Sequence, residues 1–457
     1  MRQNVKNQFP LAPAFKEDQH TRELKTISDI LDQHPEIAEL VTKDLTHGRR
    51  SKVGRKGMTG EQAIRIALLK QIHKLSYREL CFHLGDSAAF RAFSRLPFGK
   101  PVKLQTVQAN VKALQPPTWE ALNRALLKDA EGAGIETGQK TRTDCTVVEA
   151  NIHEPSDSSL LWDCVRVVTR VIHRAIEAFP TEDWNFFHDR ARRAKRRAFE
   201  IKFPPRTADK TKQRVAAYRD LLEATEETYA YGLLAVAKLR TLKPLSIEDG
   251  LLIEASANEL EGHLDSTKQV IDQTRRRVLN DEKVPASEKL FSIFEKHTDV
   301  IIKDRRDTFF GHKVCLTGGA SSLIIDCVIE DGNPADSTLV KRSIERQADI
   351  YGRAPRQTSF DGGFASKQNL TEAKDLGVKD VAFHKKSGLE ITDMVKSPWV
   401  FKRLRNFRAG IEGCISTLKR AFKMDRCTWR GLDGFKSYVW ASVVSFNLIA
   451  IARCLAA

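Results

Sequence analysis

The sequence is poor in features that would direct it to a membrane or to an oxidising compartment. Its opening stretch, MRQNVKNQFPLAPAFKEDQH, is polar almost throughout and lacks the charged, apolar and small-residue regions of a signal peptide. The most apolar run, SYVWASVVSFNLIAIARCLAA at residues 437–457, is interrupted by serine, asparagine and arginine. It therefore lacks the roughly 20 clean apolar residues that a membrane span needs. We expect a buried terminal helix there.

The cysteines are also placed without the spacing of a metal site. None of the eight belongs to a Cys-x-x-Cys pair, and no cluster of His and Cys has zinc spacing. Several lie among apolar residues, as reduced thiols in protein cores do. The sequence contains no internal repeat, and no low-complexity tract beyond short basic runs. These absences exclude a zinc module and predict a protein of a reducing cytoplasm.

Positive charge is what the chain has in excess. It contains 75 Lys and Arg against 59 Asp and Glu, a formal net charge of +16. Such an excess favours a polyanionic partner, either nucleic acid or an anionic membrane surface. Since no membrane-directed segment is found, nucleic acid is the better candidate. The chain of 457 residues, 41% of them hydrophobic, is long enough for several folded domains.

The N-terminal part predicts helices. Residues 1–55 have weak helical periodicity and run into the basic stretch THGRRSKVGRKG, so we expect an arm and a basic linker. Residues 56–140 carry stronger signals and predict a helical domain. Two pairs have capping-box spacing: Thr59 with Gln62, and Ser76 with Glu79. A third helix is expected from Thr106 to Pro116. Such a domain is either a DNA reader of helix-turn-helix type or a small bundle for dimerisation or packing.

The pattern changes to a sheet after residue 140. Residues 141–152 alternate and are rich in β-branched side chains, which predicts a strand. Residues 161–307 then read as a helical, strongly charged insertion. Beyond it, residues 312–331 form two apolar halves around a Gly-Gly turn, as in a hairpin. A helix, a strand entering Asp361, a helix, a short strand and two long helices follow. The order predicts an α/β fold with a mixed sheet, interrupted after its first strand.

Two aspartates stand at unusual places in these strands. Asp144 is an ionisable residue among Cys145 and β-branched neighbours, and Asp361 ends a later strand before a Gly-Gly turn. In open α/β sheets ligands gather beyond the carboxyl ends of the strands, which favours a functional interpretation. The alternatives are a solvated residue on an edge strand for Asp144 and a turn or cap residue for Asp361. Asp326, Asp157 and Asp336 are weaker candidates for the same role.

A third acid that could join Asp144 and Asp361 in one site is Glu412, on the helix predicted for residues 397–423. Ser397 followed by Pro398 is a good helix start, and apolar residues recur at steps of three and four from Phe401 to Phe422. Together these signals predict an amphipathic helix with one buried face.

A polar stripe borders that apolar face. Arg408, Glu412 and Lys419 are four and seven residues apart and fall on one side of the helix. A salt-bridge ladder is the simple explanation. Gly410 and Gly413 favour a different explanation. Each glycine costs about 1 kcal/mol of helix stability in a helix interior, and the close approach of another group would explain why glycine is present. Two aspartates and a glutamate would suit Mg²⁺, and a two-metal site could catalyse phosphoryl transfer, with Arg408 or Lys419 holding a phosphate.

Four stretches in order carry a resemblance: TDCTVVEANIHEPSDSSLL, HKVCLTGGASSLIIDCVIEDGNPADSTL, SFDGGF and FRAGIEGCISTLKRAF. They resemble bacterial insertion-sequence transposases of the DDE class, of the ISNCY-type or a related group. In those enzymes the last helix carries Tyr-x-x-Arg-x-x-x-Glu and a Lys seven residues later. Arg408, Glu412 and Lys419 match this pattern, while Arg405 stands at the Tyr position. The resemblance covers residues 141–160 and 308–457, and residues 56–115 resemble the N-terminal helical domain of the family more loosely.

The resemblance implies an RNase H-like catalytic core over residues 141–160 and 308–457, with the helical domain before it and the helical insertion within it. It implies that Asp144, Asp361 and Glu412 bind two Mg²⁺ or Mn²⁺ ions and that Arg408 and Lys419 assist catalysis. It also implies a transposase that binds the terminal inverted repeats of its element, cleaves DNA and joins the ends to target DNA. A homodimer on double-stranded DNA in the bacterial nucleoid, away from membranes, is the expected assembly.

One basic run in the insertion is a further candidate for DNA contact. It comprises Arg190, Arg192, Arg193, Lys195, Arg196 and Arg197. Phosphate contacts supply most non-specific affinity for DNA, although such a run can also be a solvated helix face. Trp184 upstream of it is expected in the core of the insertion. Two other functions stay open at this point: an RNase H-like nuclease without joining activity, and an inactive DNA-binding relic.

Overall fold

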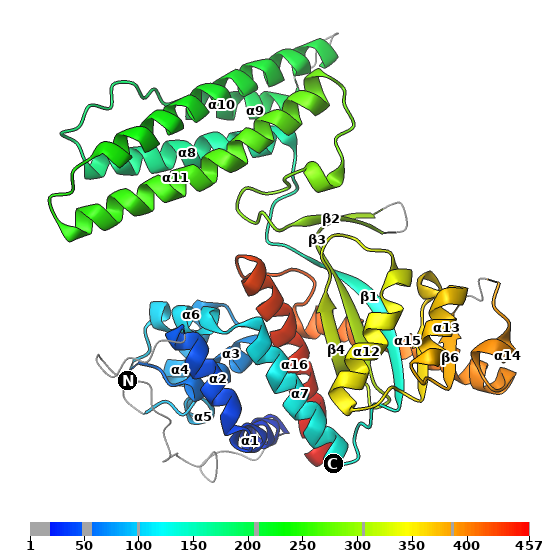
Figure 1. The fold of residues 1–457 in the computed structure, drawn as a ribbon. Helices are drawn as coiled ribbons and strands as arrows, with labels where there is room; N and C mark the ends of the chain where they lie inside the picture. The colour runs from blue at the N-terminus through cyan, green and yellow to red at the C-terminus, as the bar shows by residue number, and fades with distance from the viewer. Residues whose placement is uncertain are drawn as a thin grey trace. The chain divides into compact units, whose positions relative to one another are not determined.

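The structure is a computed structural model that describes residues 19–47, 57–97, 101–204, 210–303, 307–384 and 388–456. Its contacts divide the chain into two compact units. One unit is formed by Met1–Asn151 and Gly311–Ala457, and the other is Ile152–Phe310, which interrupts it. Figure 1 shows the elements of each. The division into four parts drawn from the sequence stays a prediction.

A mixed sheet of six strands has the order β2-β3-β1-β5-β6, with β4 paired to β3. The strands are β1 (Lys140–Glu149), β2 (Asp299–Lys303), β3 (Asp307–Gly318), β4 (Ile324–Ile329), β5 (Gln357–Phe360) and β6 (Asp380–Phe383). Strand β1 runs antiparallel to β3 and parallel to β5, and β5 runs parallel to β6. The β3–β4 pair is the predicted hairpin. The predicted fold class, an α/β fold with a mixed sheet and helical regions, is confirmed.

Helices cover both faces of this sheet. Alternate residues of β1 point to opposite faces, and their partners show which helix lies on each. The Thr143 hydroxyl lies 3.4 Å from Ser343 Oγ on α12 (Val340–Tyr351). Its neighbour Arg142 donates to the backbone oxygen of Phe407 on α15 (Pro398–Phe422) at 2.9 Å. Helices α12 and α15 therefore lie on opposite faces. Along the chain, α13 (Lys367–Asp375) follows β5, and α14 (Ile391–Met394) precedes α15.

The N-terminal helices follow their capping signals. They are α1 (Gln19–Asp32), α2 (Pro35–Thr46), α3 (Gly60–Ile72), α4 (Tyr77–Asp86), α5 (Ala88–Phe93), α6 (Leu104–Ala113) and α7 (Pro116–Gly132). Both predicted capping boxes are present, at the starts of α3 and α4. The third helix begins at Leu104 rather than Thr106, with Lys103 as its N-cap. Pro116 begins the next helix, because proline fits the first helical position.

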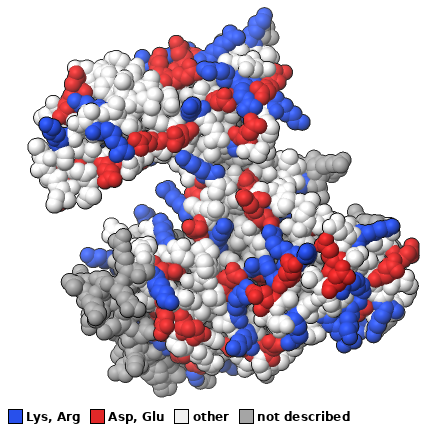
Figure 2. All heavy atoms as spheres, in the orientation of Figure 1, with Lys and Arg blue, Asp and Glu red and all other residues white. Residues whose placement is uncertain are grey.

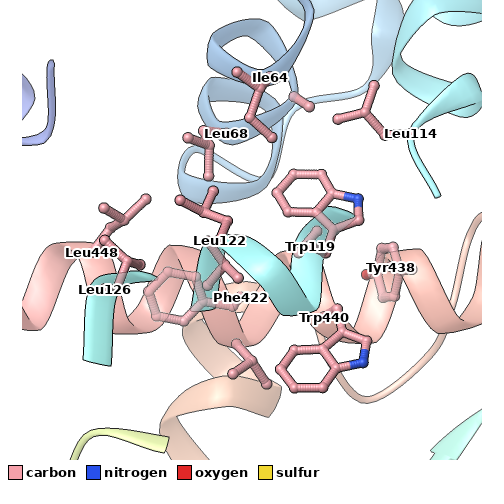
Figure 3. Close-up of a cluster of buried hydrophobic side chains, with 14 of the residues drawn as sticks. Ile64, Leu68, Leu114, Trp119, Leu122, Leu126, Phe422, Tyr438, Trp440 and Leu448 are labelled. Atoms are coloured by element: carbon pink, nitrogen blue, oxygen red, sulfur yellow. The ribbon is translucent and has the colours of Figure 1, made fainter. Parts of the chain in front are cut away.

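These helices share one apolar core with the end of the chain. Figure 3 shows side chains of α3, α7, α15 and α16 (Leu432–Ala456) meeting in one cluster, with Trp119 of α7 and Tyr438 of α16 among them. Helices α1 and α2 belong to the same core, so residues 19–46 differ from the predicted arm. Helices this short gain stability from packing rather than from a sequence pattern. Residues 48–56 of the predicted basic linker lie outside the described residues.

The last helix, α16, is the buried terminal helix expected from the sequence. Leu432–Leu455 is the single described helix long and apolar enough to cross a membrane by length and composition. It is largely buried, and His312 of β3 packs edge-on against its Phe435, with ring centroids 4.8 Å apart. A core helix meets the same length and composition test, so the feature is weak evidence for a membrane.

The second unit is a helical bundle with its own core. It contains α8 (Asp157–Ala178), α9 (Ala191–Lys202), α10 (Lys210–Thr241) and α11 (Ile247–Thr274), followed by a π-helical turn at Arg275–Leu279. Trp184 is buried in this core, as expected, and its indole N–H donates to the backbone oxygen of Phe179 at 3.0 Å. A short 3₁₀ turn lies at Ala286–Glu288 in this unit, and two others lie at Asp336–Thr338 and Gly362–Phe364 in the first unit.

Candidate active site

The register of two parallel strands brings Asp144 and Asp361 together. Thr143 of β1 pairs with Phe360, the last residue of β5. Asp144 and Asp361 each follow one residue later, so both lie at the next position on adjacent strands. Asp361 caps the turn Gly362–Phe364 without a side-chain hydrogen bond, which leaves its carboxylate available. The sheet thus places two acids at the carboxyl end of β5, where ligands gather in such folds.

Helix α15 carries the third acid to the same place. Ser397 is its N-cap, and its hydroxyl accepts from the backbone N–H of Val400 at 3.4 Å. The Ser359 hydroxyl of β5 donates to the backbone oxygen of Leu404 at 3.0 Å, which fixes the helix against the strand. One turn beyond Leu404 lies Arg408, and one turn further lies Glu412.

Arg408 contacts all three acids. Its Nη1 lies 3.3 Å from Asp144 Oδ2 and 3.6 Å from Asp361 Oδ1, and its Nη2 lies 2.5 Å from Glu412 Oε1. Only 8% of Arg408 is exposed, so its charge is largely withdrawn from water and needs these partners. Arg408 and Glu412 are therefore part of an ion-pair network that joins β1, the end of β5 and α15. A salt-bridge ladder along α15 alone does not describe these contacts.

The three carboxylates differ in exposure. The side chain of Asp144 is 19% exposed, that of Asp361 42%, and that of Glu412 59%. Asp144 also accepts from the backbone N–H of Cys145 at 2.8 Å. The site is thus anchored at Asp144 and opens to solvent at Glu412. A large ligand can reach the carboxylates from the side of α15.

The donor set suits a hard divalent cation. Two aspartates and a glutamate offer only oxygen ligands, as Mg²⁺ and Mn²⁺ prefer. Within the described ranges, no group of three Asp, Glu, His or Cys side chains is arranged to enclose an ion. The Arg408 guanidinium lies among the acids and occupies that space. By donor type the residues fit a divalent metal ion, and Arg408 supplies the positive charge among them.

Two other residues of α15 were singled out by the resemblance. Lys419 lies two turns beyond Glu412 on the same helix and is half-buried. Arg405, at the position where the family pattern has Tyr, is exposed and lies three residues before Arg408. The helix therefore presents three basic residues around Glu412.

Arg142 is a residue of this region that the sequence analysis missed. It lies two residues before Asp144 on β1, so both face α15. Its guanidinium carbon lies 4.5 Å from the centre of the Phe407 ring, and it donates to Ser322 Oγ at 2.9 Å. A Cβ on Gly410 would lie 1.8 Å from Arg142 Nη1. The expected close approach at Gly410 is thus confirmed, whereas Gly413 faces open space and that expectation is wrong.

These two glycines allow a matched test of packing at the site. Gly410→Ala is expected to lower the free energy of unfolding by about 1–3 kcal/mol, because it displaces the buried Arg142 from its hydrogen bonds. Gly413→Ala is expected to raise it by about 0.5–1 kcal/mol, since alanine favours a helix and meets no neighbour. Urea unfolding of both variants measures the difference. Equal effects of the two changes would show that Arg142 does not depend on Gly410.

The other acids considered have structural partners. Asp326 is 2% exposed and accepts two hydrogen bonds from Arg346, at 2.6 and 2.7 Å. Asp157 accepts two from Arg277, both at 2.9 Å, within the helical unit. Asp336 pairs with Lys313 of β3. None of the three contacts Arg408 in the described part of the chain.

The basic run of the insertion is divided between two environments. Arg193 and Arg197 form ion pairs with Asp220 of α10, and Arg190 pairs with Glu227. Arg192, Lys195 and Arg196 are exposed, Arg196 with Glu200 at 4.0 Å. Figure 2 likewise shows acidic and basic side chains interspersed on the visible face of the molecule. Half of the run therefore neutralises acids within the bundle, and the other half faces outward.

Two family models match the chain. Residues 270–448 match the family described as "Transposase DDE domain", and residues 13–110 match "Transposase domain (DUF772)". The first match contains Asp361, Arg408, Glu412 and Lys419, while Asp144 lies outside both. No curated protein and no solved structure matches the chain.

A mixed α/β core with acids at adjacent strand ends, together with the first of these matches, defines an enzyme of metal-dependent phosphoryl transfer. Both matched families are transposase families, and they occur in one chain on either side of β1. The chain therefore contains a DDE-type transposase domain, and this similarity implies DNA transposition, with DNA as the substrate. The α/β core described above is consistent with the RNase H-like core of that class.

Proposed function

We propose that this transposase binds the terminal inverted repeats of an insertion sequence, cleaves the DNA at its ends and joins the released 3′ hydroxyls to target DNA. Both reactions are in-line phosphoryl transfers, and the proposal assigns them to one site without a covalent protein–DNA intermediate. The observation that carries it is the convergence of Asp144, Asp361 and Glu412 on Arg408. Two strands and a helix are needed to assemble this group, which is more than a surface salt bridge requires.

The proposed roles follow from exposure and chemistry. Asp144, Asp361 and Glu412 would hold two Mg²⁺ or Mn²⁺ ions, which supply charge stabilisation to the attacking and leaving oxygens when bound. The planar guanidinium of Arg408 can hold two phosphate oxygens at once, and Lys419 offers a point charge further along the helix. Asp144, the least exposed acid, fixes the position of Arg408 relative to β1.

The remaining assignments concern DNA and assembly. The N-terminal helices and the exposed residues Arg192, Lys195 and Arg196 are proposed to contact DNA, whereas Arg190, Arg193 and Arg197 are engaged with acids of α10. Cutting two element ends and joining them in concert calls for two active sites, so a homodimer on DNA is proposed. Its place of action would be the nucleoid in the cytoplasm of a bacterial host.

Cleavage and strand transfer on labelled DNA test this proposal. The substrate contains the DNA that flanks the coding sequence on each side. Wild type and Glu412→Gln are each assayed in the presence of Mg²⁺ and in the presence of EDTA. Release of 3′ ends and their joining to a target plasmid are expected for wild type with Mg²⁺ only. Glu412→Gln is expected to bind the DNA and to lack both reactions, since glutamine removes a ligand charge but keeps the shape.

Two other outcomes identify the rival functions. Cleavage without joining, at the flanking DNA, would contradict the transposition proposal and indicate a nuclease. Binding without chemistry in either protein would indicate an inactive relic. Asp393→Asn, a change at an exposed residue of α14, is the control for loss of one carboxylate.

A further inference from the structure

A cavity of about 300 Å³ lies in the first unit, away from the carboxylates. Its walls come from the end of α3, the start of α4 and the C-terminal end of α15. Three lysines line it, Lys70, Lys74 and Lys423, against a single acid, Glu79. That glutamate is engaged in the capping box of α4, where its carboxylate accepts from the backbone N–H of Ser76 at 2.7 Å. Three lysines against one glutamate leave the cavity with an excess of positive charge.

Lys70 is the buried cation of this cavity. Only 7% of the residue is exposed, and its ammonium group lies 4.9 Å from the ring centre of Tyr77 and 5.8 Å from that of Trp429. Across the described ranges its ammonium makes no hydrogen bond and no ion pair. Burial, and then the nearby charge of Lys423, lower the pKa of Lys70 to about 8. A lysine in such surroundings is costly for folding unless an anion joins it.

Tyr77, which also lines the cavity, brings further donors close to it. The Tyr77 hydroxyl is buried and has no hydrogen-bond partner in the described part of the chain. Burial raises the pKa of Tyr77 above its usual value, so the hydroxyl keeps its proton and can donate. Tyr77 is also the first residue of α4, a helix of 10 residues. Backbone N–H groups at a helix start, with the positive end of the helix dipole, favour an anion.

The walls of the cavity are tied to each other. The ammonium of Lys423, the C-cap of α15, donates to the backbone oxygen of Lys74 at 3.1 Å. The ammonium of Lys74 donates back to the backbone oxygen of Arg420 at 3.4 Å. Both lysines have positive φ, 56° and 54°, a backbone conformation that non-glycine residues adopt where the surroundings hold them. The end of α15, the helix that carries Glu412, is thus joined to the N-terminal helices at this cavity.

We propose that this cavity binds one phosphate group of the DNA backbone. Lys70 and the Tyr77 hydroxyl contact its oxygens, and Lys74 and Lys423 close it from the rim. A phosphate held here would set the position of DNA relative to α15. The identity of the ligand rests on the proposed function, because DNA is the polyanion that this enzyme handles. A free phosphate ion has the same chemistry and is separated from DNA in the test below.

The test measures binding of a short fluorescein-labelled duplex to the full chain over a series of NaCl concentrations, without metal. Lys70→Met is expected to weaken binding about tenfold and to reduce the slope of log K against log [salt] by about 1, equally for element ends and for unrelated sequence. Tyr77→Phe is expected to weaken binding a few-fold. Lys341→Met, which removes an exposed lysine of α12 on the other face of the sheet, is the control and should change neither quantity.

Folding is followed in the same proteins. Lys70→Met is expected to melt at a temperature equal to or above that of wild type. In the absence of a bound anion the Lys70 charge is buried without a counter-charge, and methionine removes it. Affinity and slope equal to wild type would overturn the proposal. Stabilisation of wild type by inorganic phosphate together with unchanged DNA binding would also overturn it, in favour of a free-anion site. Because binding is measured without metal, the result does not depend on whether the protein cleaves or joins DNA.

Discussion

Asp144→Asn is expected to lower DNA cleavage and strand transfer by about 1,000-fold or more, the order seen when a group essential to a transition state is removed. The residue follows Thr143 in β1, so its position next to Asp361 is set by the strand register. It anchors Arg408 from the least exposed of the three carboxylates. The free energy of unfolding is expected to fall by only about 1–2 kcal/mol, since asparagine keeps the shape and Arg408 retains Asp361 and Glu412 as partners.

Asp326→Asn should show the opposite pattern. Asp326 is 2% exposed and forms a two-hydrogen-bond ion pair with Arg346, which also contacts Glu120 at 2.9 Å. Loss of one partner of a buried pair is expected to cost about 2–4 kcal/mol of stability. Activity per folded molecule, measured well below the melting temperature, should stay within a few-fold of wild type. Loss of activity in folded Asp326→Asn with full activity in Asp144→Asn would reverse the assignment of these two acids.

Much of this site could be predicted from local sequence signals. The β-branched residues around Asp144 predicted β1, the Gly-Gly turn after Asp361 predicted the end of β5, and Ser397 with Pro398 predicted the start of α15. Each signal is local, because strand propensity, turn conformation and helix capping depend on residues close in the chain. The residue types suggested that the three carboxylates form one metal site, and the resemblance implied the same, but the position of Arg408 among them was not predicted.

What the sequence could not predict depends on partners far along the chain. Asp326 resembles Asp144 as an acid within an apolar strand, and only Arg346 on α12 distinguishes their roles. In the sequence, Arg193 and Arg197 cannot be distinguished from DNA-binding residues of the same basic run. Their ion pairs with Asp220 of α10 are seen only in the structure. Arg142 carried a usable signal, since it alternates with Asp144 on β1, but its contact with Gly410 required the helix to be in place.

Arg408→Gln is expected to make the stability of the protein depend on a divalent metal ion. In wild type the guanidinium lies among three carboxylates and offsets their mutual repulsion. Glutamine removes that charge, so the free energy of unfolding in EDTA should fall by about 1–3 kcal/mol. Because the cation-binding space is no longer occupied, Mg²⁺ should bind the variant more tightly, and ligand binding to the folded state alone raises its stability.

Thermal unfolding with EDTA and with increasing Mg²⁺ measures this, without reference to activity. The melting temperature of Arg408→Gln is expected to rise by several degrees with Mg²⁺, while that of wild type without DNA rises less. Arg405→Gln, exposed on the same helix, is the control and should behave as wild type. The double variant with Glu412→Gln should lose the response. An equal Mg²⁺ response in Arg408→Gln and wild type would mean that the guanidinium and the metal ion do not compete, and that Arg408 acts on the substrate alone.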